Sequence, residues 1–373
     1  MNRRIFVRNT LGGMALLSLG AALPSCPAGK TAYYAPDDFA EMPKADAHFH
    51  YDTFNDACLK YAASIHMHIL SINVDAGENL DKQLAIGERF KKQYPGCFDF
   101  LGTFPTDGFG SPTFSADILR RVQRCIAAGA AGIKIWKNIG MTLKDADGKW
   151  VMADHPAFDP VYAWLEKEGL PLAAHLGEPR NCWLPYEEIT MGNDLNYYTK
   201  HPEYHMYRYP DAPSYDAQIA ARDRLLEKFP RLTLVGAHIG SLEWNLDEVA
   251  RRFDRYPNFH VDLSARLGHV QLQTLQDRQK VCDFFLNWQD RILYGSDVSL
   301  DDRNTQHAEE RSRALYDYWR RHWLFLATGE TVPAEEFNTP DPPKTIEGLR
   351  LPKNVVDKLF LKNFQRIFTA NQQ

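Results

Sequence analysis

Two histidines stand one residue apart in the segment KADAHFHYDT, residues 44–53. Residues i and i+2 of an extended strand point to the same face, so His48 and His50 would place their imidazoles side by side. Neutral imidazole is a common ligand for zinc and related metals, and a shared metal ion would explain the pairing. The pair alone is weak evidence, so its interpretation depends on which other residues the fold brings to it.

Short apolar runs alternate with longer amphipathic runs from residue 45 onward. The strand-like runs lie at residues 45–50, 68–74, 97–104, 131–136, 170–177, 232–240, 258–265 and 291–297. Helical patterns lie between them, for example at residues 115–129, 158–169 and 215–229. This alternation predicts an α/β fold with a parallel sheet, and the strand count favours a (β/α)8 TIM barrel over a doubly wound sheet.

An α/β barrel carries its catalytic residues at the C-terminal ends of its strands. His175, His238 and Asp297 end the fifth, sixth and eighth predicted strands, and Lys134 lies in the fourth. Each has a structural alternative when taken alone, since a histidine can pack in a core and an aspartate favours turns. Together with the first histidine pair, these residues form a pattern of nitrogen and oxygen donors that predicts a metal site.

The motifs around these residues resemble those of a known enzyme family. ADAHFH, GIKIW, HLGEP, VGAHIGS and YGSDVS are similar to motifs of the amidohydrolase superfamily, and within it of the amidohydrolase-related group that includes the aminocarboxymuconate-semialdehyde decarboxylases. The likeness covers residues 43 to about 300 and extends more loosely to residues 351–368, which resemble that group's closing helices. It implies one divalent metal, most often zinc with manganese or iron as alternatives, held by His48, His50, His175 and Asp297.

The resemblance also implies roles for further residues of the site. His238 would hold or activate a metal-bound water or contact the substrate. Lys134 would be carboxylated and bridge a second metal in binuclear relatives, whereas in one-metal relatives it would be an ordinary charged contact, with Lys137 as a rival for either role. A metal with an open position makes hydroxide available at neutral pH, and Asp297 would carry the water's proton to the leaving group. This chemistry suits a hydrolase of amides, lactones or esters, with a metal-dependent non-oxidative decarboxylase as the alternative.

The loops after two predicted strands offer candidate substrate contacts. Glu178, Arg180 and Trp183 follow the fifth strand, and Arg266 follows the seventh. Arginine suits a carboxylate of a sugar or aromatic substrate, although a salt bridge within the loop is an equal alternative. The aromatic-rich insertion at residues 178–214 would stack on a ring, act as a lid, or pack on the barrel or a subunit interface.

Three further histidines need an interpretation. His66 and His68 form a second H-x-H pair, but they precede the second predicted strand, at the end of a barrel that serves stability. We interpret them as structural. His205 lies in the aromatic insertion, from which it could reach the substrate.

The first 25 residues predict an export signal that is not part of the fold. They combine basic residues, an apolar run and a small-residue site, and RRIFV resembles the twin-arginine pattern. LPSC resembles a bacterial lipobox that would lipidate Cys26, with secretion without an anchor as the alternative. We therefore expect an exported protein, periplasmic or a membrane-anchored lipoprotein, with a linker at residues 26–42 and one barrel domain at residues 43–373.

Composition and charge narrow the class of partner. A net charge of −5 and 44% hydrophobic residues are typical of a soluble globular protein and give no reason to expect nucleic acid or an anionic membrane as partner. We expect a small-molecule substrate and, from the resemblance, a homodimer. The alternative to an enzyme is a lipoprotein that uses the barrel as a scaffold to bind a ligand without catalysis.

Two expectations concern the rest of the chain. The stretch 302–373 has a mostly helical pattern with a proline-rich break at residues 338–344. The cysteines beyond Cys26 are scattered singly, which predicts buried thiols and neither a disulfide framework nor a zinc cluster; they are Cys58, Cys97, Cys125, Cys182 and Cys282.

Overall fold

Eight parallel strands follow one another along the chain and form the wall of a barrel in the computed structural model, which describes residues 31–77, 79–303 and 307–369. The strands are β1 (Lys44–Asp52), β2 (Met67–Ile72), β3 (Phe98–Leu101), β4 (Ile133–Ile135), β5 (Leu172–Ala174), β6 (Leu234–Gly236), β7 (Phe259–Asp262) and β8 (Ile292–Leu293). A ninth strand, β9 (Val298–Asp301), continues the line of β8 and pairs in parallel with the end of β1. All belong to the unit Ala32–Gln373.

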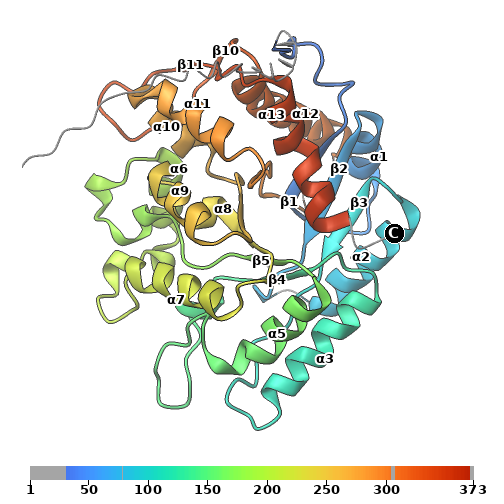
Figure 1. Cartoon of the computed structure of the whole chain (residues 1–373), viewed down its shortest axis with the longest axis vertical. Coiled ribbons are helices and arrows are strands. Elements are labelled where there is room, and N and C mark those ends of the chain that lie inside the picture. Colours follow the sequence, from blue (N-terminus) through green and yellow to red (C-terminus); the bar gives the residue numbers. More distant parts are fainter. Residues whose placement is uncertain (1–30, 78, 304–306, 370–373) are drawn as a thin grey trace, which may run out of the picture. The chain divides into compact units, whose positions relative to one another are not determined.

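Backbone contacts close the two strand groups into one barrel. The strands pair in the orders β3-β2-β1-β9 and β4-β5-β6-β7-β8. A parallel bridge between Gly102 and Ile133 joins β3 to β4. On the other side, the Ala47 amide donates to the Tyr294 carbonyl at 2.9 Å and so joins β1 to the end of β8. The predicted (β/α)8 barrel is confirmed, and Figure 1 shows helices around the labelled strands β1 to β5.

Helices connect the strands, and the longer ones cover the outside of the barrel. They are α1 (Ala57–Ser64), α2 (Leu80–Gln93), α3 (Phe114–Ala127), α4 (Asn138–Met141), α5 (Asp159–Glu168), α7 (Tyr215–Lys228), α8 (Ala237–Gly240), α9 (Leu246–Arg255), α10 (Leu267–Gln276) and α11 (Arg278–Asn287). Local chemistry sets their ends: the Ser214 side chain accepts from the Ala217 amide to begin α7, and Gly169, at φ 66°, ends α5. The three helices predicted at residues 115–129, 158–169 and 215–229 are present within one or two residues.

The aromatic insertion has a small core of its own. It contains three-residue and four-residue 3-10 turns around one helix, in the order η2 (Arg180–Trp183), η3 (Tyr186–Glu188), α6 (Gly192–Lys200), η4 (Pro202–Tyr204) and η5 (Met206–Arg208). Cys182, Ile189, Tyr198 and Met206 pack with Met141 in this core. The insertion is therefore an ordered, packed segment attached at the loop after β5.

The C-terminal region differs from the sequence expectation in one respect. The helix α12 (Ala308–Ala327) and the shorter α13 (Lys353–Asp357) are followed by two π-helical segments, Lys358–Lys362 and Gln365–Thr369. The proline-rich break, however, lies inside a hairpin of two antiparallel strands, β10 (Thr331–Pro333) and β11 (Thr345–Glu347). Strands of three residues with charged and proline neighbours carry too little alternating hydrophobicity to be seen in the sequence.

The remaining sequence expectations concern thiols and the N-terminus. Four cysteines are buried and Cys97 is half-buried, and all five that the structure describes are free thiols. The predicted export signal and Cys26 lie outside the described residues. Among the residues described, there is no helix with the length and apolar character needed to cross a bilayer.

Candidate metal centre

Polar side chains from five strands meet at the C-terminal end of the barrel. They line a pocket of about 390 Å³, here called the catalytic pocket. The residues predicted from strand ends that line it are His48, His50, Lys134, His175, His238 and Asp297. Lys137 and Trp136 line it as well, from the segment after β4. The barrel therefore brings together the six side chains whose positions in the sequence suggested a metal site.

His48, His50 and Asp297 form one closely spaced group. The Nε2 atoms of His48 and His50 each lie 3.3 Å from Asp297 Oδ1. His50 Nδ1 lies 2.9 Å from the Ile72 carbonyl, which can only accept, so the proton of the neutral ring is on Nδ1 and Nε2 is a free electron-pair donor. Candidate ligand atoms of these three residues lie within 4.8 Å of one another, a spacing that suits one metal ion.

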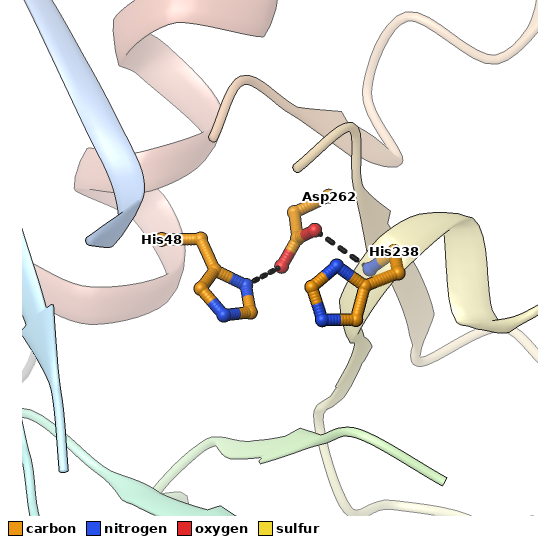
Figure 2. A group of neighbouring side chains, drawn as sticks. All are labelled: His48, His238 and Asp262. Carbon is orange, nitrogen blue, oxygen red and sulfur yellow. Dashed lines mark hydrogen bonds and ion pairs between the residues drawn. The ribbon is translucent and has the colours of Figure 1, made fainter. Parts of the chain in front are cut away.

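Asp262, at the end of β7, organises two of the histidines. Its Oδ2 accepts from His48 Nδ1 at 2.8 Å, and its Oδ1 accepts from the His238 amide at 2.9 Å, so the carboxylate lies between the two rings (Figure 2). Burial raises the pKa of Asp262, but His48 and the Ser264 hydroxyl outweigh it and hold the pKa below its usual range. An ionised acceptor at Nδ1 fixes the His48 proton there and leaves Nε2 free to bind a metal.

Sequence reasoning missed Asp262. The residue stands at the end of the predicted strand 258–265, in the same position relative to its strand as His175 and His238. The strand-end rule that selected those histidines would also have selected this aspartate, whose role shows only in its contacts with β1 and β6.

The backbone at His238 and Asp297 is unusual. His238 has φ 59° and Asp297 has φ 66°, in the left-handed region that residues with a Cβ seldom occupy. The Asp297 amide donates to the His48 carbonyl at 2.8 Å, and His238 Nδ1 donates to the Ser264 carbonyl at 3.0 Å. Such strained conformations persist where surrounding contacts enforce them and cluster at functional sites. Both side chains are therefore held at the pocket by contacts from neighbouring strands.

Two buried polar atoms of the centre lack partners among the described residues. They are Lys134 Nζ and His175 Nε2, neither of which has a hydrogen-bond partner among those residues, although Glu178 Oε2 lies 3.7 Å from the latter. Burial lowers the pKa of Lys134 to about 8, and burial first and nearby lysines second lower the pKa of His175 well below its usual range. A buried neutral imidazole without a hydrogen-bond partner is costly unless it binds something, so the donor set fits a divalent cation. His175 lies next to His238, with ring centroids 4.3 Å apart. It belongs to neither of the two groups whose ligand atoms all lie within 4.8 Å of one another, which are His48, His50 and Asp297, and His48, His238 and Asp262.

The four residues predicted to contact substrate from the loops lie in two different places. Glu178 is buried and forms an ion pair with Lys137, and Arg266 lies 3.9 Å from its Oε2. Arg180 and Trp183 line another pocket, where the Arg180 guanidinium lies 4.4 Å above the Trp244 ring. None of the four therefore lines the catalytic pocket, but Glu178 contacts two of its lining residues, Lys137 through the ion pair and His175, whose Nε2 lies 3.7 Å from Glu178 Oε2.

Histidines outside the centre have structural surroundings. His68 lies 3.0 Å from Asp99 Oδ2 at the beginning of β2, as expected of a residue at the N-terminal end of the barrel. His205 is buried in the insertion, where its ring stacks on Tyr186 at 4.5 Å and Tyr198 at 5.5 Å between centroids. The insertion instead contacts a lining residue of the catalytic pocket, because the Tyr204 ring lies 4.9 Å from Lys137 Nζ.

Comparisons with known proteins find a matching family model and several solved structures with a similar fold. The family model described as amidohydrolase matches residues 104–369. A 2,6-dihydroxybenzoate decarboxylase from Rhizobium is 16% identical with a TM-score of 0.48, covering 88% of this chain and 99% of its own. A 5-carboxyvanillate decarboxylase from Sphingomonas paucimobilis is 13% identical with a TM-score of 0.45, covering 87% of this chain and 98% of its own. An uncharacterised TIM-barrel protein from Bordetella bronchiseptica is 14% identical with a TM-score of 0.47, covering 89% of this chain and 100% of its own. No curated protein sequence matches the chain.

Proposed function

The chain belongs to the amidohydrolase family, and on that premise we propose that it is an exported metal-dependent hydrolase of a small amide, lactone or ester. The family recognised in the sequence motifs is thereby confirmed. One observation carries the proposal: His48 Nε2 and His50 Nε2 both point to the Asp297 carboxylate. The Nδ1 atom of each ring is bound to an acceptor, Asp262 for His48 and the Ile72 carbonyl for His50. This arrangement prepares nitrogen and oxygen donors for a cation before any cation binds.

The metal would be held by His48, His50 and Asp297, with His175 and His238 on the facing wall. A divalent ion at such a site supplies a Lewis acid that makes hydroxide available at neutral pH. His238 donates its Nδ1 proton to the Ser264 carbonyl, so its Nε2 is an acceptor when the ring is neutral. Burial lowers the pKa of His238 well below its usual range, which keeps the ring neutral and suits it to orient water or bind the metal rather than to donate to an oxyanion.

Asp297 is the proposed proton carrier. Burial raises the pKa of its carboxyl group, but the histidines around it, His238 first, outweigh burial and hold the pKa well below its usual range. The carboxylate is therefore ionised at neutral pH and can accept the proton of the attacking water, then pass it to the leaving oxygen or nitrogen.

A metal-dependent non-oxidative decarboxylase is the second candidate. Lys134 and Lys137 place two amino groups on the wall of the catalytic pocket, which suit a substrate that carries a carboxylate, while Arg303 of the same wall is paired with Asp301. The same lysines would bind a carboxylate-bearing sugar or aromatic compound in a hydrolase. Non-catalytic binding by a lipoprotein is less well supported, because a binding protein needs no strained aspartate among histidines.

Removal of metal tests the proposal. We expect protein purified without added metal to contain close to one equivalent of zinc, manganese or iron by elemental analysis. Dialysis against a chelator should abolish release of acid from a panel of esters, lactones and amides, and the metal should restore it. Metal content below a few tenths of an equivalent, with no uptake on reconstitution, would contradict the proposal. Release of CO2 from aryl or sugar acids in place of acid release would identify the decarboxylase.

Export is tested by cell fractionation of the full chain. We expect the protein in the periplasm or the membrane fraction, and we expect Arg3→Lys together with Arg4→Lys to leave it in the cytoplasm, because the twin-arginine pathway recognises that pair. Cys26→Ser should move a membrane-bound form to the soluble periplasmic fraction if the cysteine is lipidated. A native chain that stays with cytoplasmic markers contradicts the proposed export.

A further inference from the structure

Asp297 lines two cavities, not one. Besides the catalytic pocket of about 390 Å³, it belongs to the wall of a second cavity of about 510 Å³, here called the α12 chamber. The chamber lies among the segment after β7, α6, α12 and the segment that precedes β11, and it shares no other lining residue with the catalytic pocket. The proposed proton carrier therefore belongs to the walls of two separate cavities.

The α12 chamber is a polar space with an open rim. His269 and Asp194 are buried on one wall, with His269 Nε2 3.3 Å from Asp194 Oδ2. Glu335 and His322 stand on another, 3.7 Å apart. Asn193 on α6 and Ala314 on α12 are exposed at its edge, so the chamber is accessible from solvent.

A buried group in this chamber lacks a partner. His269 is 5% exposed, and its Nδ1 has no hydrogen-bond partner among the residues that the structure describes. An unpaired buried nitrogen is costly, and a ligand hydroxyl or amine would satisfy it. The wall carries the carboxylates of Asp194, Glu335 and Asp297, whose oxygens can accept hydrogen bonds from the hydroxyl or ammonium groups of a ligand.

We propose that the α12 chamber binds the leaving half of the substrate, an alcohol or amine that carries further hydroxyl groups. This inference rests on the proposed hydrolase function and deepens it. The acid half would occupy the catalytic pocket, whose lysines suit a carboxylate, and the scissile bond would lie beside Asp297. The substrate is then an ester or amide that joins an anionic acyl half to a hydroxylated leaving half.

The bond changes follow directly. The oxygen of water forms a bond to the carbonyl carbon, and the carbon–oxygen or carbon–nitrogen bond to the leaving half breaks with its electron pair remaining on the leaving atom. Asp297 accepts the proton from water and gives it to that atom, so that a carboxylic acid and an alcohol or amine are formed. Hydrolysis needs a space on each side of the scissile bond, whereas in decarboxylation the group split off is CO2, which is too small to need a second polar chamber.

A substitution at the rim tests the chamber without touching the catalytic pocket. Ala314→Trp places a large side chain at the edge of the chamber, and Arg313→Trp is the matched control, because Arg313 is exposed on the same helix and does not line the chamber. Binding of glucose, N-acetylglucosamine and sorbitol to the metal-loaded protein is measured by saturation-transfer NMR, with and without saturating glutarate. Hydrolysis is measured with methyl and sorbityl esters of one dicarboxylic acid.

The expected result is that at least one polyol binds to the native protein and to Arg313→Trp, and that glutarate does not displace it. Ala314→Trp should weaken this binding at least tenfold and lower kcat/KM for the sorbityl ester at least tenfold, with less than a twofold change for the methyl ester. Absence of polyol binding to the native protein, or equal binding to Ala314→Trp, overturns the inference. Polyol binding that Ala314→Trp removes, in a protein that hydrolyses neither ester, keeps the chamber as a binding site and overturns the proposed hydrolase instead.

Discussion

Replacing Asp297 with asparagine is expected to lower kcat by about 10³-fold, within the range for loss of a positioned general acid–base group. The amide has the shape of the carboxylate and keeps an oxygen that can face His48 and His50, but it cannot accept a proton from water or return one to the leaving group. The metal should therefore stay bound. The measurement is kcat for the ester or lactone found in the substrate panel, together with metal content by elemental analysis of the same preparation.

Asp301→Asn provides the matched control for that result. Asp301 lines the same pocket on β9 and forms an ion pair with Arg303, whereas the Asp297 carboxylate lies beside His48 and His50. We expect less than a tenfold change in kcat for this variant. Turnover by Asp297→Asn within tenfold of the native rate, with metal bound, would show that another group carries the proton.

The barrel was predictable because its signal is repeated along the chain. Each strand is a short apolar run that ends near glycine or a polar residue, and eight such runs separated by amphipathic helices leave few other topologies. The hairpin of β10 and β11 was not predictable in this way, because it is held by its packing, with Val332 and Ile346 buried in the main core. A pair of three-residue strands has no periodic pattern of its own.

The metal centre was predictable from the same repetition, and its surroundings were not. His48, His50, His175, His238 and Asp297 are recognisable because the C-terminal ends of barrel strands meet at one face. The loop after β5 shows the limit of that rule. Gly177 has φ 75°, and beyond this turn Glu178 enters an ion pair with Lys137, 41 positions earlier, while the chain continues to a different pocket at Arg180. Such pairings depend on the folded loop and have no signature in the order of residues.

Asp262 offers the sharpest test of how this centre is prepared for a metal. Its carboxylate holds the proton of His48 on Nδ1, which leaves Nε2 free as a ligand. In Asp262→Asn, the oxygen of the amide can still accept from the His238 amide, and its NH2 group then faces His48 Nδ1. That group can only donate, so it favours the tautomer with the proton on Nε2, where the metal would bind.

We therefore expect Asp262→Asn to weaken metal binding about 10–100-fold, measured by competition with a chromophoric chelator, because loss of such a supporting contact has an effect of that size. Activity should recover substantially in excess metal, which distinguishes this variant from Asp297→Asn.

Asp99→Asn is the matched control: Asp99 is also a buried carboxylate paired with a histidine on the barrel, His68, but at the N-terminal end. It should lower thermal stability and leave metal affinity unchanged. Equal metal affinity of the native protein and Asp262→Asn would mean that the Asp262 carboxylate does not set the His48 tautomer, whereas a loss in both variants would indicate a general effect of destabilising the barrel.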